Sequence, residues 1–456
     1  MAPPGDNDAA ARRRPVRSAI VEPVQHFLHT EAASGVFLLA AAVAALIWAN
    51  SPLADGYEAL WTTEVGFEFG SLHLIEDLRH WVNDLLMAFF FFVVGLEIKR
   101  ELVLGDLRDP RAAALPLIAA LGGMVAPALF YLVFNLGGPG NNGWGVPMAT
   151  DIAFAVGVLA LVGTRAPSGL KVFLLTLAVA DDLGAIVVIA LFYTRDLAPS
   201  WLLVAVLTIG AVMLLQRLGI RRYVPYIVAA AVLWLAIFES GVHATIAGVV
   251  LGFLTPSRPL HPPEAVAGLA ERHLERLQES PPDGVADETE QATLLEVARL
   301  AREGVSPLAR LESMLHPWTS FLVLPLFALA NAGVRLPDGG IGGAFAEPVT
   351  LGIIAGLVVG KPLGIMAASF LTVKAGLGSL PRACGWLEMA GVGLLAGIGF
   401  TVAIFIAGLA FVEPALADFA KIGILAASVI AGVLGAAFLL WRDAAKHPDE
   451  IASSTT

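Results

Sequence analysis

Long apolar runs separated by short polar stretches dominate the chain. A helix needs about 20 apolar residues to cross the hydrocarbon core of a bilayer, so each run predicts a transmembrane helix. The first run resembles the apolar part of a signal peptide, but it is longer than is usual for one and many runs follow it. The twelve predicted spans are residues 32–50, 79–104, 111–136, 143–164, 169–194, 199–217, 222–239, 241–255, 316–334, 346–373, 386–411 and 416–441.

The distribution of Lys and Arg between the spans predicts that both termini are cytoplasmic. One set of alternate loops and tails holds 23 basic residues, and the other set holds 4. Without the long loop the contrast is still 17 against 4, and basic loops stay on the cytoplasmic side. The predicted divisions are a tail at 1–31, spans 1–8 at 32–255, a cytoplasmic loop at 256–314, spans 9–12 at 315–442 and a tail at 443–456.

Three polar stretches carry further predictions. Residues 1–17 contain four arginines and no apolar core, which predicts a disordered basic tail. Residues 63–74 alternate between apolar and polar positions around a Gly-Ser pair, which predicts an external β-hairpin, with an irregular loop as the alternative. The loop at 256–314 predicts one or two surface helices joined by disorder, and either a regulatory role or a tolerated insertion explains it.

Composition agrees with a polytopic membrane protein. The chain has 456 residues, of which 57% are hydrophobic and 15% are charged, and its mean hydropathy is +0.76. A soluble domain has about a quarter of its residues charged. The single cysteine, Cys384, excludes an intrachain disulfide and a cysteine-based metal cluster. No segment resembles a nucleic-acid-binding module, so no nucleic acid partner is expected.

Three aspartates lie within the fourth and fifth predicted spans, at Asp151, Asp181 and Asp182. An ionised carboxylate there costs about 3 kcal/mol on the insertion scale unless water, a cation or a partner charge compensates it. A carboxylate that holds a proton or a cation, but not both, is a simple ion-exchange device. Adjacent helical residues point about 100° apart, so one aspartate can face the ion while the other faces a second partner. The alternative is a purely structural pair.

Helix-breaking residues accompany the first of these aspartates. Pro147 precedes Thr150 and Asp151, and proline removes a backbone donor, so the fourth span is expected to break near the middle of the membrane. The eleventh span contains a matching run of glycines that includes Gly397 and Gly399. Interrupted spans at corresponding places in two halves indicate a transport site near the membrane midplane. Helix packing alone is the alternative explanation.

Lys361 is the only basic residue in the middle of a predicted span. An unpaired charge at that depth is costly, so we expect Lys361 to pair with an aspartate or to neutralise the dipoles of the broken helices. Lysine can also extend to the membrane surface, but about twelve apolar or small residues flank Lys361 on each side.

Charged residues and histidines near the ends of spans form a second set of candidates. The charged residues allow local ion pairs and otherwise form a solvated helix end. The histidines titrate in the physiological range and are otherwise packed polar residues. The set comprises Glu97, Lys99, Arg100 and Glu101 at the end of the second span, together with His243 and His316.

Six motifs together make the sequence resemble the NhaA family of sodium/proton antiporters. This family is itself a standard example of inverted repeats with broken helices. The motifs occur in the family's order over residues 30–440. They are PMATDIAFA at 147–155, ADDLGAI at 180–186, GVHAT at 241–245, FALANAG at 327–333, GKPLG at 360–364 and GIGFT at 397–401.

The resemblance implies an all-α polytopic fold and assigns roles to the candidate residues. It implies about twelve helices, with spans 3–5 and 10–12 as inverted three-helix repeats and with spans 4 and 11 crossing as discontinuous helices. Na+ and protons would bind at Asp181 and Asp182, beside Thr150 and Asp151, with Lys361 compensating their charge. Glu97, Arg100, Glu101, Glu312 and His316 would form a pH-regulatory end, to which His243 is a further candidate.

The function expected from this resemblance is electrogenic antiport. The protein would sit in the lipid bilayer of the bacterial inner membrane, export Na+ and Li+ for protons, form a homodimer through the external hairpin and need no cofactor. The longer tails and the enlarged 256–314 loop depart from the family. Two other classes remain: an intramembrane aspartyl protease, although its sequence patterns are absent, and a cation channel lined by carboxylates.

Overall fold

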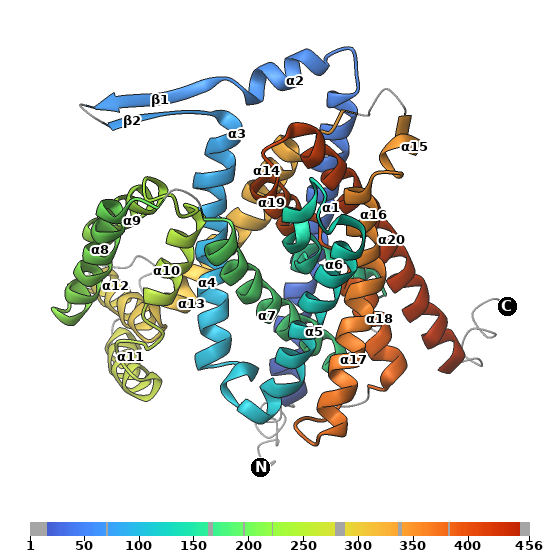
Figure 1. Cartoon of the computed structure of the whole chain (residues 1–456). Coiled ribbons are helices and arrows are strands. Elements are labelled where there is room, and N and C mark those ends of the chain that lie inside the picture. Colours follow the sequence, from blue (N-terminus) through green and yellow to red (C-terminus); the bar gives the residue numbers. More distant parts are fainter. Residues whose placement is uncertain are drawn as a thin grey trace. The chain divides into compact units, whose positions relative to one another are not determined.

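A computed structural model shows a chain built almost entirely of helices (Figure 1). It describes residues 16–69, 72–162, 167–194, 197–220, 222–278, 288–335, 340–381 and 384–446. Residues 1–15 of the predicted N-terminal tail, residues 279–287 of the long loop and residues 447–456 of the C-terminal tail lie outside the described residues.

The described helices account for the predicted spans. Among the described residues, eight helices are long and apolar enough to cross a bilayer, or ten if each of two bent pairs is one span. The bent pairs are residues 33–49 with 54–61, at 116°, and residues 386–396 with 400–410, at 48°. Two shorter apolar helices, Tyr223–Phe238 and Thr245–Leu254, occupy the seventh and eighth predicted spans. The prediction of an all-α polytopic membrane protein is therefore confirmed.

The first helix, α1 (Val16–Ala49), begins well before the apolar run that predicts it. The segment before that run is not continuously apolar, so a search for membrane spans does not detect it. The predicted tail at 1–31 therefore overlaps the start of this helix.

The chain divides into two compact units, and the first contains most of the elements of the two predicted three-helix repeats. It comprises residues 1–55, 115–181 and 331–456. Its elements are α1, most of α5 (Pro110–Asn135), the 3-10 helix η3 (Asn141–Met148), α6 (Ile152–Val162), the first part of α7 (Ser168–Phe192), α15 (Gly340–Ala344), α16 (Pro348–Ile354), the π-helical turn η6 (Ala355–Gly360), α17 (Lys361–Lys374), α18 (Trp386–Ala396), α19 (Phe400–Ala410) and α20 (Pro414–Lys446).

Close approach of backbones holds the first unit together. Gly122 of α5 and Gly364 of α17 face each other so closely that a Cβ on either residue would collide with the other's carbonyl oxygen. Small residues at such contacts let membrane helices pack by dispersion forces where the hydrophobic effect does not drive association. Helix α20 packs against both α16 and α18, which fixes the tenth, eleventh and twelfth spans as one group.

The second unit comprises residues 56–114 and 182–330. Its elements are α2 (Ala54–Trp61), β1 (Glu64–Phe69), β2 (Leu72–Asp77), α3 (Leu78–Trp81), the π-helical turn η1 (Val82–Leu86), α4 (Met87–Val103), the 3-10 turn η2 (Asp106–Arg108), the rest of α7, α8 (Pro199–Arg217), α9 (Tyr223–Phe238), α10 (Thr245–Leu254), α11 (Pro263–Gln278), α12 (Glu288–Glu303), α13 (Pro307–Trp318), the π-helical turn η5 (Thr319–Val323) and α14 (Leu324–Asn331).

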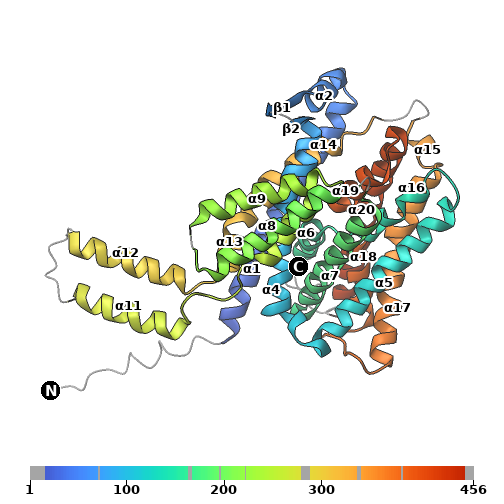
Figure 2. The ribbon, with the colours of Figure 1, turned by 60° about the vertical axis from the view of Figure 1, so that its left-hand side comes forward.

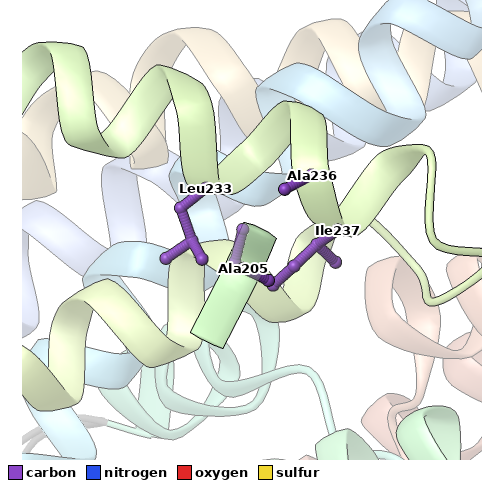
Figure 3. Packing of buried hydrophobic residues seen from close by; sticks show 5 residues of the cluster. Ala205, Leu233, Ala236 and Ile237 are labelled. Carbon is purple, nitrogen blue, oxygen red and sulfur yellow. The ribbon is translucent and has the colours of Figure 1, made fainter. Parts of the chain in front are cut away.

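Helices α8, α9 and α10 of this unit share a buried apolar cluster. Ala205 of α8 packs against Leu233, Ala236 and Ile237 of α9, and Ala247 of α10 completes the cluster (Figure 3). Alanines on all three helices allow close packing around the larger leucine and isoleucine side chains.

Helix α10 is too short to cross a bilayer alone. Its 10 residues span about 15 Å, roughly half of the hydrocarbon core. Its glycines lie against α4, and a Cβ on Gly248 would strike the carbonyl of Ala88. The Nζ atom of Lys99 donates hydrogen bonds to the Phe253 and Thr255 carbonyls, at 2.7 and 2.5 Å. This lysine therefore satisfies carbonyls that the end of a short helix leaves without amide donors.

The alternating stretch after the first span forms a two-stranded antiparallel hairpin. Strands β1 and β2 pair from Glu64 opposite Asp77 to Phe69 opposite Leu72. The hairpin leads directly into α3, whose first turn is capped by the Asp77 side chain, which accepts a hydrogen bond from the His80 amide at 2.7 Å. Asp77 is therefore both the last residue of β2 and the N-cap of α3.

The long loop contains two helices that pack side by side, α11 and α12 (Figure 2). Glu303, at the end of α12, accepts hydrogen bonds on its carbonyl oxygen from the amides of Leu260 and His261. Its carboxylate also lies 3.3 Å from the His261 imidazole. These contacts join the segment before α11 to the end of α12.

Tyr57 gives a direct test of the packing in the second unit. Its side chain is fully buried, and its hydroxyl lies 2.9 Å from the Leu329 carbonyl and 3.1 Å from the Ala330 carbonyl at the end of α14. We expect Tyr57→Phe to lower stability by about 1–2 kcal/mol, because buried carbonyls lose their donor. The apparent melting temperature of purified protein measures this. Tyr223→Phe, at a tyrosine 69% exposed, is the control, and equal losses in both variants would contradict the prediction.

Candidate functional site

The fourth span is interrupted in the middle of its length. The 3-10 helix η3 ends at Met148, Ala149 is extended, and α6 begins at Ile152. Pro147 near the end of η3 has no amide with which to continue a helical ladder. The Oδ1 atom of Asp151 accepts a hydrogen bond from the Phe154 amide at 2.9 Å, which is the geometry of an N-cap. The sequence thus ends one helical segment with proline and starts the next with aspartate.

The eleventh span is interrupted in the same way. Helix α18 ends at Ala396, α19 starts at Phe400, and the two helices are bent by 48°. The three residues between them begin and end with glycine. Gly397 lies against the carbonyl of Leu357, 2.5 Å from where a Cβ would stand, so a side chain does not fit there.

The two interruptions meet and complete each other's hydrogen bonds. The Asp151 amide donates to the Ile398 carbonyl at 2.7 Å. The Thr150 hydroxyl donates to the Ala396 carbonyl, in the last turn of α18, at 2.9 Å. In return, the Oδ2 atom of Asp151 accepts from the amide and the hydroxyl of Thr401, at 3.0 and 2.6 Å. The crossing is therefore held by polar contacts that neither span can make alone.

Asp151 serves the N-termini of two helices at once. One carboxylate oxygen caps α6 and the other receives the Thr401 amide in the first turn of α19. Helix N-termini carry partial positive charge, so a carboxylate between two of them is stabilised by both. The Phe400 amide, which also belongs to this first turn, donates to the Ser428 hydroxyl of α20 at 3.2 Å.

Lys361 joins this crossing to the fifth span. Its side chain is fully buried, and its Nζ atom lies 2.6 Å from Oδ2 of Asp181, which is 1% exposed. The same ammonium donates a hydrogen bond to the carbonyl of Met148, the last residue of η3. The lysine therefore compensates a buried carboxylate and also faces the partially negative end of a helix.

One oxygen of Asp181 is buried away from Lys361. This Oδ1 atom has no hydrogen-bond partner within 3.5 Å among the residues that the structure describes, and Thr150 is a polar neighbour of the carboxylate. A buried polar atom without a close partner is unusual in native proteins and requires an explanation. Asp182 follows it on α7, is 3% exposed and is the first residue of the second unit.

The charged residues at the end of α4 gather around one arginine. Arg100 lies 3.3 Å from Glu101 and 4.0 Å from Glu97, and it forms an ion pair with Glu312 of α13. His316 lies one helical turn after Glu312. The structure thus brings these five predicted residues to one place within the second unit.

His243 lies apart from this group and faces another element. Its Nε2 atom is 2.9 Å from the carbonyl of Tyr193, at the end of α7. Lys99, also singled out from the sequence, contacts the end of α10 instead of this cluster.

Sequence reasoning missed two contributors to the crossing. Thr401 was recognised only as part of a motif, although its position just after the glycine run and Phe400 marks the first turn of α19. Ser428 gave no signal, because a single serine in an apolar span is usual in membrane helices. Its hydrogen bond to the Phe400 amide depends on tertiary structure alone.

Comparisons with known proteins agree with this geometry. The family model described as Na+/H+ antiporter 1 matches residues 25–439. A protein of Sorangium cellulosum named Na(+)/H(+) antiporter NhaA 2 is 48% identical over 436 residues, which cover 96% of this chain and 92% of its own length. The Na(+)/H(+) antiporter NhaA of Rhodopirellula baltica is 46% identical over 92% of this chain and 94% of its own, and that of Wolinella succinogenes is 46% identical over 91% and 92%. The chain therefore belongs to the NhaA family of Na+/H+ antiporters, which are membrane transporters and not enzymes.

Proposed function

We propose that the protein is an electrogenic antiporter of the bacterial inner membrane that exports Na+, and also Li+, in exchange for protons. One observation carries the proposal. Asp181 is buried beside two crossed helix interruptions, with one oxygen paired to Lys361 and the other without a hydrogen-bond partner within 3.5 Å among the described residues. Such a carboxylate needs a positive partner, and the partner is exchangeable.

The exchange follows from charge compensation. Lys361 neutralises Asp181 in this structure, and a proton or a Na+ ion would neutralise it equally well in other states. Because all three act on the same charge, binding of one displaces the others. Asp182 provides a second carboxylate on the adjacent face of α7, so Na+ would be held by Asp181 and Asp182 together.

Thr150 and Asp151 would support this ion from the crossing. Both oxygens of Asp151 already accept hydrogen bonds from the protein, so its main contribution would be a fixed negative charge close to the ion. The Thr150 oxygen would be a neutral ligand from the interrupted segment, beside the neutral backbone carbonyls that discontinuous helices offer to cations in transporters.

Unequal charge exchange would let membrane potential drive export. Each net elementary charge moved inward gains about 2.3 kcal/mol per 100 mV. More protons entering than Na+ leaving would therefore use both the proton gradient and the potential. The excess of basic residues on one set of loops supports cytoplasmic termini.

We further propose that pH regulates transport through the cluster around Arg100. A change in the protonation of Glu97, Glu101, Glu312 or His316 would alter the contacts between α4 and α13. His243 would respond separately through its contact with the Tyr193 carbonyl. A homodimer would form through the exposed hairpin of β1 and β2, which offers two strand edges to a second copy.

Transport in everted membrane vesicles tests the proposed function. The lumen is acidified by respiration, NaCl or LiCl is added outside, and a dye reports luminal pH. We expect Na+ and Li+ to raise luminal pH, because each ion that enters releases protons, whereas choline chloride changes nothing. The absence of a Na+ response at every pH between about 6.5 and 9, where His and perturbed carboxylates titrate, would contradict antiport.

A further inference from the structure

A wide helical turn lies directly before Lys361. The turn η6, Ala355–Gly360, is π-helical, and the amide of Lys361 donates to the carbonyl of Gly356, five residues earlier. The helices on either side, α16 and α17, have ordinary α geometry. The turn therefore accommodates one residue more than an α-helical turn would hold.

The next residue, Pro362, explains why the turn is wide. In an α-helix its ring would collide with the carbonyl four residues earlier, that of Val358. Proline also leaves the Leu357 carbonyl without a helical donor, because the Lys361 amide is used on Gly356 and residue 362 has no amide. A wider turn is one of the local adjustments by which membrane helices accept proline.

The wide turn packs against both interruptions. A Cβ on Gly356 would stand 2.8 Å from Pro147 of η3, and one on Gly360 would stand 2.9 Å from the Cα atom of Pro127 of α5. On the side of the eleventh span, the Leu357 carbonyl lies against Gly397. These backbone contacts hold the turn in one rotation about the helix axis. The direction in which the Lys361 side chain points therefore depends on how many residues the turn contains.

We propose that Pro362 is a positioning residue for antiport, because the π-helical turn that it imposes directs Lys361 at Asp181. Closing the turn to α geometry changes the register by one residue, which rotates the following side chains by about 100°. With the glycines held against the prolines, that rotation carries the Lys361 ammonium away from Oδ2 of Asp181 and from the Met148 carbonyl. This inference rests on the proposed function and names a residue that touches neither ion nor carboxylate.

The test compares Pro362→Ala with Lys361→Gln and with the double variant. Apparent Na+ affinity of the purified full-length protein is read from the rise in melting temperature with NaCl, at constant ionic strength with choline chloride. This readout does not require transport. Pro116→Ala is the matched control, since Pro116 lies inside α5 and also interrupts a helical ladder.

We expect Pro362→Ala to shift the apparent Na+ affinity by at least about threefold, in the same direction as Lys361→Gln. In the Lys361→Gln background the proline substitution should cause no further shift, because its effect acts through the ammonium. Pro116→Ala should leave the affinity unchanged. A structure of the Pro362→Ala variant should show the amide of residue 361 bonded to Leu357 instead of Gly356.

Three results would overturn the inference. They are an unchanged affinity in Pro362→Ala, an equal shift with and without Lys361, and a π-helical turn that persists in the variant's structure. If the wild type transports Na+ while Pro362→Ala behaves like it, only this inference fails. If the wild type neither binds nor transports Na+, the proposed function fails and the inference fails with it.

Discussion

Vesicles containing Asp182→Asn are expected to show no Na+-dependent rise in luminal pH. Asparagine has nearly the same shape and fits the same buried place, but it carries no charge and binds neither a proton nor Na+ at neutral pH. Loss of one charged ligand is worth about 1.5–3 kcal/mol, or at least tenfold in apparent affinity. If Asp182 also carries a proton, the exchange stops altogether. The initial rate of dye response, at equal protein in the membrane, measures the effect.

Glu388→Gln is the matched control for this experiment. Glu388 is 5% exposed and lies in the first turn of α18, where it accepts a hydrogen bond from the Gly385 amide at 2.8 Å. Its carboxylate is 3.4 Å from Arg442. It is therefore a buried acid outside the proposed ion site, and its amide should support transport within about twofold of wild type. Full activity in Asp182→Asn would contradict the role proposed for Asp182.

Removal of the Asp151 side chain is expected to damage the fold as well as transport. In Asp151→Ala, the amides of Phe154 and Thr401 and the Thr401 hydroxyl lose their acceptor in a buried place. Each unsatisfied donor costs about 1–3 kcal/mol, so we expect a total loss of about 3 kcal/mol or more. Thermal unfolding of purified protein, together with the vesicle assay, measures both consequences.

Two further variants separate this effect from a general loss of charge. Asp151→Asn keeps one acceptor oxygen and should fall between wild type and alanine. Asp55→Ala removes an exposed aspartate that pairs with Arg335 at 3.2 Å, and it should leave the melting temperature unchanged. An Asp151→Ala protein as stable as wild type would show that the crossing does not depend on this carboxylate.

The sequence was sufficient for the all-α membrane class and for the order of the apolar helices, because hydrophobic length is a local property. It also indicated both interruptions. Pro147 and the glycine run that ends at Gly399 disturb the helical ladder through their own chemistry, wherever the rest of the chain lies. The expectation that Lys361 pairs with an aspartate rested only on free energy, because an unpaired charged lysine at that depth in the membrane is unfavourable.

The contacts of the crossing were beyond the sequence because they join residues far apart in the chain. Nothing local indicates that Asp151 accepts from Thr401, or that the Phe400 amide meets Ser428. The two-unit organisation was equally unpredictable, since it divides α7 between Asp181 and Asp182. The early start of α1 escaped notice for a different reason, because that part of the helix is not continuously apolar.

The crossing also has a consequence for the synthesis of the protein. The acceptor at Asp151 and the donors at Thr401 are 250 residues apart. At about 5–20 residues per second, the ribosome needs roughly ten to fifty seconds to add the missing part. During that time the nascent fourth span has polar backbone groups that no later helix yet satisfies, and lipid does not hydrate them. A chain truncated before the eleventh span keeps this defect permanently, which makes it a substrate for membrane quality control.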